Sequence, residues 1–160
     1  MHQGHELAML LRKAYLSFHR RANARAIKLG VTADQFVVLT MLAEEEGITQ
    51  ITIVERTASD PNTLTAILRL LERQGLVRRE AHAHDGRARC VFLTPAGRRM
   101  QKRVAKQANL LLAAMWEAVD AKARPVVLTA LRQILGCFSS KTPRPAGNGQ
   151  LRKRAALKRQ

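Results

Sequence analysis

Short polar residues and arginines share one side of a helix that the sequence predicts over residues 60–74. Leucine and isoleucine recur on the opposite side at the i, i+3, i+4 spacing of an amphipathic helix. The residues that fall largely away from that apolar stripe are Thr63, Thr65, Arg69 and Arg73. Hydroxyl and guanidinium groups suit hydrogen bonds to base edges and phosphates, so this face suits nucleic acid. A solvated charged face would look similar, and the helix alone leaves both interpretations open.

A basic hairpin follows this helix. Hydrophobic residues alternate with polar ones and predict two strands, over residues 77–83 and 88–93. The Asp85-Gly86 pair between them is typical of a tight turn. The arginines of the hairpin are Arg78, Arg79, Arg87 and Arg89. Arginine suits a narrow, electronegative minor groove, and we expect Asp85 to be the one nearby carboxylate that relieves the repulsion among them. The alternative is a solvated β-ribbon.

Two helices are predicted before residue 47. They must position the helix over residues 60–74 and the hairpin that follows it. The first spans residues 6–29 and ends at Gly30, as a left-handed cap would end it. The second begins at Thr32, where Gln35 three residues later completes a capping-box pattern. It stops at the acidic run over residues 44–47.

A third, shorter helix is predicted over residues 49–59. Several β-branched residues in this segment would also permit a strand. Ile51, Val54 and Ala58, however, keep helical spacing, and another helix follows at once. That next helix has Asp60 where an N-cap belongs and Pro61 where the first turn tolerates proline.

Two further helices and a polar tail complete the chain. Thr94-Pro95 opens the first of these helices, and Pro125 opens the last, which carries an apolar stripe to Phe138. Helices over residues 6–29 and 95–138 hold more apolar surface than one small lobe can cover, which predicts a homodimer. After Ser139 the composition is that of a disordered segment.

Positive charge is the strongest feature of the composition. The 160 residues include 28 Lys and Arg against 12 Asp and Glu, for a net charge of +16. Residues 141–160 hold seven basic residues and no acid, and residues 61–106 hold eleven basic residues and three acids. Such a field concentrates polyanions at the surface, and nucleic acid is the commonest of them. We expect the tail to add affinity for DNA without sequence specificity.

The expected fold is mainly α with a small β-hairpin wing, a winged helix-turn-helix flanked by N- and C-terminal dimerisation helices. Only 4% of residues are aromatic, so the core consists mostly of aliphatic side chains, which favours helices. We expect an N-terminal dimerisation helix over 1–30, a winged lobe over 31–94, C-terminal dimerisation helices over 95–140 and a disordered basic tail over 141–160. No signal peptide or membrane span is predicted, which indicates a cytoplasmic protein, associated with the nucleoid if it binds DNA.

Enzymatic, metal and redox chemistry find little support in the sequence. It has no phosphate-cradling glycine loop, carboxylate cluster with metal spacing or nucleophile elbow, so neither catalytic residues nor a cofactor are expected. His82 and His84 could present metal ligands with Cys90 across the hairpin, but they would lie on an exposed wing. Cys90 is expected in a buried strand and Cys137 in the core.

Two motifs are similar to those of the multiple-antibiotic-resistance regulator (MarR) family of bacterial transcription factors. The run over residues 60–77, ending in Leu71-Glu72-Arg73-Gln74-Gly75-Leu76-Val77, resembles the recognition helix of the family with its L-x-x-x-G-L-V ending. Asp85-Gly86-Arg87 matches the D-x-R signature of its wing, and Leu93-Thr94-Pro95-Ala96-Gly97 follows. The resemblance covers roughly residues 5–138.

The resemblance implies a homodimer that binds a pseudo-palindromic operator in double-stranded DNA and is most often a repressor. The recognition helix would lie in the major groove, with Asn62, Thr63 and Thr65 facing bases and Arg69 and Arg73 facing phosphates. The wing would follow the minor groove, with Arg87 inserted and Asp85 holding it. Ala66 departs from the basic or polar residue of many relatives. The DNA-contacting set is Thr49, Gln50, Thr52, Pro61, Asn62, Thr63, Thr65, Arg69, Arg73, Arg78, Asp85, Arg87 and Arg89.

Many members of the family also bind small phenolic or aromatic anions between the dimerisation helices and the winged lobe. The resemblance therefore implies an effector pocket framed by Tyr15, Phe18, His19 and Phe36, although helical spacing makes these residues core residues first. Some relatives sense oxidants through a cysteine near the N-terminal helices, and this sequence has none there.

A sequence-indifferent architectural protein that binds DNA or RNA is the competing function, and the basic tail favours it. The short polar residues on the exposed helix face favour base reading instead. Survival of binding to one short duplex in excess unrelated DNA would distinguish the two.

Overall fold

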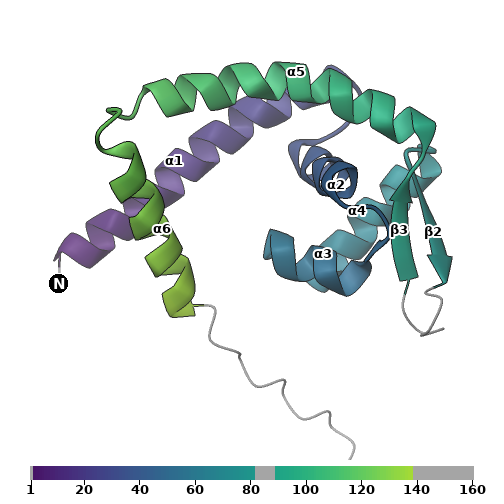
Figure 1. The fold of residues 1–160 in the computed structure, drawn as a ribbon, viewed down its shortest axis with the longest axis horizontal. Coiled ribbons are helices and arrows are strands. Elements are labelled where there is room, and N and C mark those ends of the chain that lie inside the picture. Colours follow the sequence, from purple (N-terminus) through teal and green to yellow (C-terminus); the bar gives the residue numbers. More distant parts are fainter. Residues whose placement is uncertain (1, 82–88, 139–160) are drawn as a thin grey trace, which may run out of the picture. The chain divides into compact units, whose positions relative to one another are not determined.

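The computed structural model describes residues 2–81 and 89–138 and forms two compact units, residues 1–116 and 117–160, which we describe separately. Within the described ranges no helix is both long and apolar enough to cross a membrane. The helices and strands are α1 (His2–Ile27), α2 (Ala33–Glu44), β1 (Ile48–Thr49), α3 (Gln50–Thr57), α4 (Pro61–Arg73), β2 (Val77–Ala81), β3 (Arg89–Leu93), α5 (Pro95–Glu117) and α6 (Arg124–Phe138) (Figure 1).

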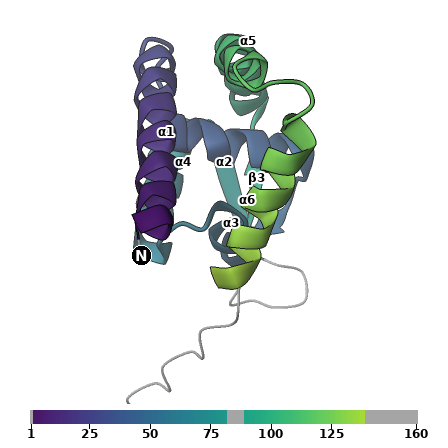
Figure 2. The same cartoon turned by 90° about the vertical axis from the view of Figure 1, so that its left-hand side faces the viewer.

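In the first unit, α1 and α5 flank α2, which runs between them (Figure 2). The predicted capping box is present at the start of α2. The Thr32 hydroxyl accepts the Gln35 N–H at 3.1 Å, and the Gln35 side-chain oxygen accepts the Thr32 N–H at 2.8 Å. The preceding helix, α1, ends at Ile27 rather than at residue 29, and it begins at His2 rather than at residue 6.

The predicted N-cap of α4 is also confirmed. The Asp60 carboxylate accepts the backbone N–H groups of Asn62 at 2.9 Å and Thr63 at 3.1 Å. At the other end Gly75 has φ +68°, a left-handed conformation that favours glycine. This turn lets the Leu76 N–H donate to the Leu71 carbonyl at 2.9 Å, so β2 starts directly after the helix.

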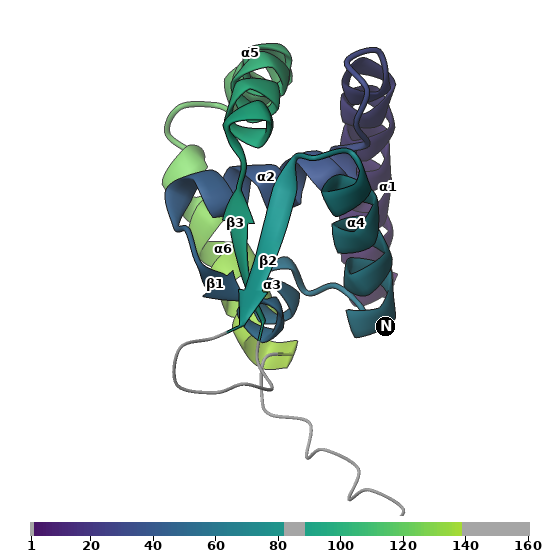
Figure 3. The ribbon, with the colours of Figure 1, turned by 90° about the vertical axis from the view of Figure 1, so that its right-hand side faces the viewer.

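The predicted hairpin is part of a three-stranded antiparallel sheet in the order β1-β3-β2 (Figure 3). Val77 lies opposite Leu93, and Ile48 of β1 lies opposite Val91. The strand β1 was not predicted, because two residues are too short for a pattern and their pairing partner lies some forty residues away in the sequence. Residues 82, 83 and 88, which the sequence assigned to the strands, lie outside the described residues.

The core of the first unit joins α2, α3, α4 and the sheet. Its fully buried side chains include Leu39, Leu42, Ile53, Leu64, Leu68, Leu71 and Val91. In α3 the apolar spacing that predicted the helix marks its buried side only at Val54, which is partly buried and packs against the core. Ile53 is fully buried, whereas Ile51 is 62% exposed and Ala58 adopts the left-handed C-cap. On so short a helix either of two apolar faces could turn inward. The packing of α3 against α2 and α4 buries the face that carries Ile53.

The described part of the second unit is α6 with its preceding turn. Arg124 donates to the Glu117 carboxylate at 3.1 Å, and α6 has no buried residue. Cys137 is exposed, so its expected place in the core is wrong for this single chain, whereas Cys90 in β3 is buried as expected. No described residue of its own unit therefore covers the apolar stripe of α6.

Candidate nucleic-acid interface and ligand pocket

The exposed face of α4 presents the residues that the sequence assigned to base and phosphate contacts. Leu64, Leu68 and Leu71 are fully buried and fix the orientation of the helix. Asn62, Thr63, Arg69 and Arg73 are exposed, together with Pro61 and Ala66. Asn62, Arg69 and Arg73 are seven and four residues apart, which places them along one stripe of the helix. The face therefore offers an amide at its start and two cations along its length.

The backbone at the start of α4 is not free to bind an anion. Asp60 already accepts the N–H groups of Asn62 and Thr63. The N–H groups of a helix N-terminus bind phosphate only while they lack a partner. At this end of α4 the side chains, not the backbone, are available for a ligand.

Hydrogen bonds hold α3 against α4. The Gln50 side-chain amide donates to the Thr65 hydroxyl at 2.7 Å, and that hydroxyl donates to the Pro61 carbonyl at 2.8 Å. Because the hydroxyl proton of Thr65 already donates to Pro61, this hydroxyl can only accept a further hydrogen bond. Gln50 and Thr65 were both predicted to contact DNA. In the structure their hydrogen bond also helps to set the angle between α3 and α4.

The N-terminus of α3 is similarly occupied. The Thr49 hydroxyl accepts the Thr52 N–H at 3.2 Å and lies 2.9 Å from the Thr52 hydroxyl. The two threonines therefore form a local pair, and the Thr52 N–H is no longer available to a phosphate. Their hydroxyl groups are partly buried rather than fully exposed.

An ion pair ties α4 to β2. Arg79 donates from Nε to a Glu72 carboxylate oxygen at 3.0 Å, and a second N–H of the same guanidinium reaches the same oxygen. Hydrogen bonds from Arg79 lower the pKa of Glu72 against the opposing effect of burial, and the charges of Arg79 and Arg89 lower it further. The same hydrogen bonds raise the pKa of Arg79.

The arginines of the sheet fall on two faces. Cross-strand partners share a face, so Arg89 lies with Ala81 and, two residues along β2, with Arg79 on the side of Glu72. Arg78 points to the other side, where it pairs with Glu80 and lies 4.6 Å from the centre of the Phe92 ring. The expectation that Asp85 alone relieves the charge of the hairpin is wrong, because Glu72 and Glu80 each pair with an arginine. Asp85 and Arg87 lie outside the described residues.

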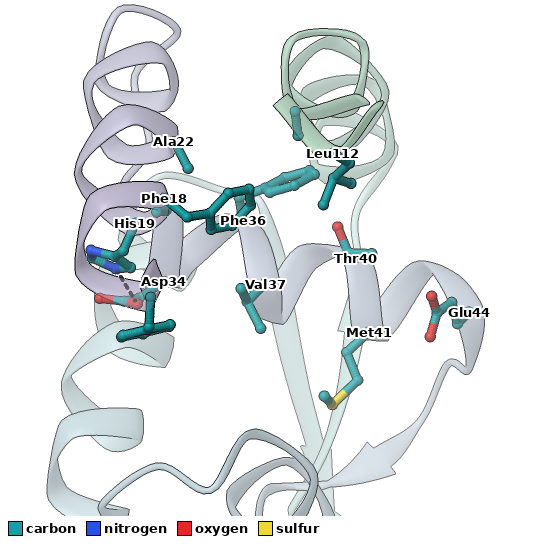
Figure 4. A pocket seen from close by; sticks show the side chains of 13 residues that line it. Phe18, His19, Ala22, Asp34, Phe36, Val37, Thr40, Met41, Glu44 and Leu112 are labelled. Carbon is teal, nitrogen blue, oxygen red and sulfur yellow. Dashed lines mark hydrogen bonds and ion pairs between the residues drawn. The ribbon is translucent and has the colours of Figure 1, made fainter. Parts of the chain in front are cut away.

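A pocket of about 350 Å³ opens between α1, α2 and α5 (Figure 4). All four residues predicted to frame an effector pocket line it: Tyr15, Phe18, His19 and Phe36. The pocket volume suits a small organic molecule, and its wall is mostly aromatic and aliphatic. The predicted juxtaposition of α1 and α2 is thus present, and Leu112 adds a wall from α5.

The polar groups of the pocket come mainly from α2. His19 Nε2 lies 3.0 Å from Asp34 Oδ1, and Glu44 lies at the far end of the helix. The Thr40 hydroxyl is buried and has no hydrogen-bond partner among the described residues. An unpaired buried hydroxyl costs about 1–3 kcal/mol, so a ligand that bonds to it would recover part of that free energy.

The sequence prediction missed the α2 wall of this pocket. Asp34, Val37, Met41 and Glu44 line it at intervals of three, four and three residues, which is one helix face. The buried side of α2, with Leu39 and Leu42, supplied the stronger apolar signal and concealed this second stripe. The described residues include no group of three or more potential metal ligands, and His82 and His84 lie outside them.

Comparison with known proteins decides the family. The MarR family model matches residues 29–88. The transcriptional regulator HosA from Escherichia coli is 39% identical over 70 residues, which are 44% of this chain and 52% of HosA. The repressor Mb2911 from Mycobacterium bovis is 31% identical over 97 residues, which are 61% of this chain and 70% of that protein. The chain belongs to the MarR family of transcriptional regulators.

The fold agrees with MarR-family structures over most of the chain. A mutant of MarR from E. coli, solved in complex with operator DNA, superposes with a TM-score of 0.74 at 24% identity, covering 81% of this chain and 94% of that one. The predicted winged helix-turn-helix is confirmed. The matched region spans about half the length of HosA, and the family model covers the part of the chain that carries α4 and β2.

Proposed function

We propose that this MarR-family chain is a homodimer that binds a pseudo-palindromic operator in double-stranded DNA and represses transcription in the cytoplasm. The observation that carries the proposal is the exposed stripe of Asn62, Arg69 and Arg73 on a helix whose opposite side is fully buried. In the major groove Asn62 and Thr63 would meet base edges, and the two arginines would meet phosphates. The operator complex of E. coli MarR and the description of Mb2911 as a repressor support this assignment.

The other predicted contacts surround this stripe. Thr49, Gln50 and Thr52 would contact phosphates beside α4, while Thr65 would accept a hydrogen bond from a base amino group. Arg89 and Arg87, with Asp85 beside it, would form the minor-groove contact of the wing. Arg78 is committed to Glu80 and Phe92 and would contribute charge rather than a direct contact.

The proposed dimer would bury apolar helix surface that one chain leaves exposed. In α5 Leu110 is 63% exposed, and in α6 Phe138 is 82% exposed. The domain boundaries proposed from the sequence, at residues 30, 94 and 140, assign these helices to dimerisation. A small aromatic or phenolic effector in the pocket would then act on both the dimerisation helices and α2, and would relieve repression by changing the spacing of the two α4 helices.

DNA recovered with the protein from genomic fragments would supply an operator for the decisive experiment. Arg69→Ala and Arg73→Ala should each reduce the slope of log affinity against log salt by about one, without changing the order of preferred sequences. Asn62→Ala should change that order, because it removes a base contact. Arg21→Ala on α1 removes the same charge away from α4 and is the matched control. Equal affinity for operator and unrelated DNA would instead establish the architectural alternative.

A further inference from the structure

We infer that the pocket between α1, α2 and α5 selects a small apolar ligand that carries a positive charge and disfavours a carboxylate. The inference deepens the proposed effector role and rests on it, but it concerns binding and is testable without DNA. It departs from the expectation drawn from the family resemblance, in which the ligands are commonly phenolic or aromatic anions.

The charges of the pocket lining are the first observation. Among the described residues that line it, the side chains that can carry a charge near neutral pH are His19, Asp34 and Glu44, and none is a lysine or arginine. The net charge of the lining is therefore negative whether or not His19 is protonated. Within the described lining a carboxylate ligand would meet no lysine or arginine, and the His19 ring is already held by Asp34 at 3.0 Å.

Glu44 is the carboxylate that remains available. It forms no ion pair with any residue in the described ranges 2–81 and 89–138, in contrast to its neighbours Glu45 and Glu46, which pair with Arg56 and Arg98. Asp34 lies ten residues earlier, roughly 15 Å along the helix axis. The pocket thus has one carboxylate near each end of its α2 wall.

Aromatic rings add to the preference for a cation. Tyr15, Phe18 and Phe36 line the pocket, and Phe18 and Phe36 lie close together in it (Figure 4). The face of an aromatic ring carries partial negative charge and attracts ammonium or amidinium groups. The unpartnered Thr40 hydroxyl can accept an N–H from such a group. Carboxylates, ring faces and a free hydroxyl together favour an N–H-bearing cation.

The net charge of +16 on the whole protein would attract an anionic ligand instead. Salt separates this long-range attraction from the effect of the groups that line the pocket. At about 0.15 M salt, exposed charges further than about 8 Å away are largely screened. A bound cation that lies within about 8 Å of Asp34 or of Glu44 keeps the attraction of that carboxylate, although both side chains are exposed and each acts more weakly than a buried one. If the pocket prefers a cation although the protein carries a net positive charge, the groups that line the pocket must cause that preference.

Three probes of one shape and different charge test the inference: 2-naphthoate, 2-naphthamide and 2-naphthamidine. Isothermal titration calorimetry on the full chain in about 0.15 M salt should rank naphthamidine tightest and naphthoate weakest. Glu44→Gln or Asp34→Asn should weaken naphthamidine binding by about two- to tenfold and strengthen naphthoate binding. Glu55→Gln removes one carboxylate from the exposed side of α3, outside the pocket, and should change neither.

Each outcome is decisive. Naphthoate binding as tightly as naphthamidine, affinities for both probes unchanged in both carboxylate variants, or binding of none of the three probes overturns the inference. Operator release, measured by fluorescence anisotropy, is a separate readout. If naphthamidine binds with the predicted dependence on Glu44 or Asp34 but does not release the operator, the charge preference stands and the effector role of the proposed function fails.

Discussion

The ion pair between Glu72 and Arg79 joins α4 to the sheet, and its removal makes a quantitative prediction. Both side chains are partly exposed, Arg79 at 25% and Glu72 at 38%, so solvent screens their attraction. A partly exposed ion pair contributes less to the free energy of unfolding than a buried one. We therefore expect Glu72→Gln to lower that free energy by about 0.5–1 kcal/mol at pH 7. The substitution keeps the shape of the side chain and removes its charge.

The pH dependence distinguishes this cause from a packing defect. The pKa of Glu72 is lower in the folded protein than its ordinary value of 4.5, so its contribution to stability is fully present above 4.5. That contribution is lost as the pH falls through the lowered folded pKa, because the carboxylate becomes protonated. The difference between wild type and Glu72→Gln should therefore shrink from pH 7 towards about pH 3.

Urea unfolding at fixed protein concentration across this pH range measures the effect. Hydrogen exchange adds a local readout, since the amides of β2 should lose protection before those of α2. Glu55→Gln is the control, because Glu55 is exposed and makes no ion pair among the described residues, and it should change stability by no more than about 0.5 kcal/mol. A penalty for Glu72→Gln that is equal at all pH values, or no larger than that of the control, would refute the reasoning.

Two further substitutions test the contacts that position α4 and the sheet. Gly97→Ala would place a Cβ 2.0 Å from the Leu76 carbonyl oxygen, so we expect a loss of about 1–3 kcal/mol in urea unfolding, whereas Gly4→Ala meets no atom within 4 Å and should cost nothing. Asp60→Ala removes the acceptor for two N–H groups at the start of α4 and should destabilise the chain by about 1 kcal/mol, while Asp60→Asn should retain most of the cap. An unchanged free energy of unfolding in urea for Gly97→Ala or Asp60→Ala would contradict these contacts.

The sequence by itself determined the features that depend on neighbouring residues. The capping box at Thr32, the Asp60 cap with Pro61 after it and the turn at Gly75 all follow from hydrogen bonds or backbone conformations within a few residues. The apolar periods of α4 and of the strands are local in the same sense, since each repeats within a helix turn or a strand pair. For this reason the winged-helix lobe and its exposed polar face could be predicted.

Tertiary structure decided the features that join distant segments. The strand β1, the choice of Ile53 over Ile51 as the core residue of α3, and the pairing of Glu72 with Arg79 depend on which surfaces meet. The sequence placed four aromatic and histidine residues around a pocket, but it could not show that the α2 wall brings Asp34 and Glu44 to it without a lysine or arginine. The sign of the charge in a pocket is a sum over several elements, and only the packing of α1, α2 and α5 sets which charges contribute to it.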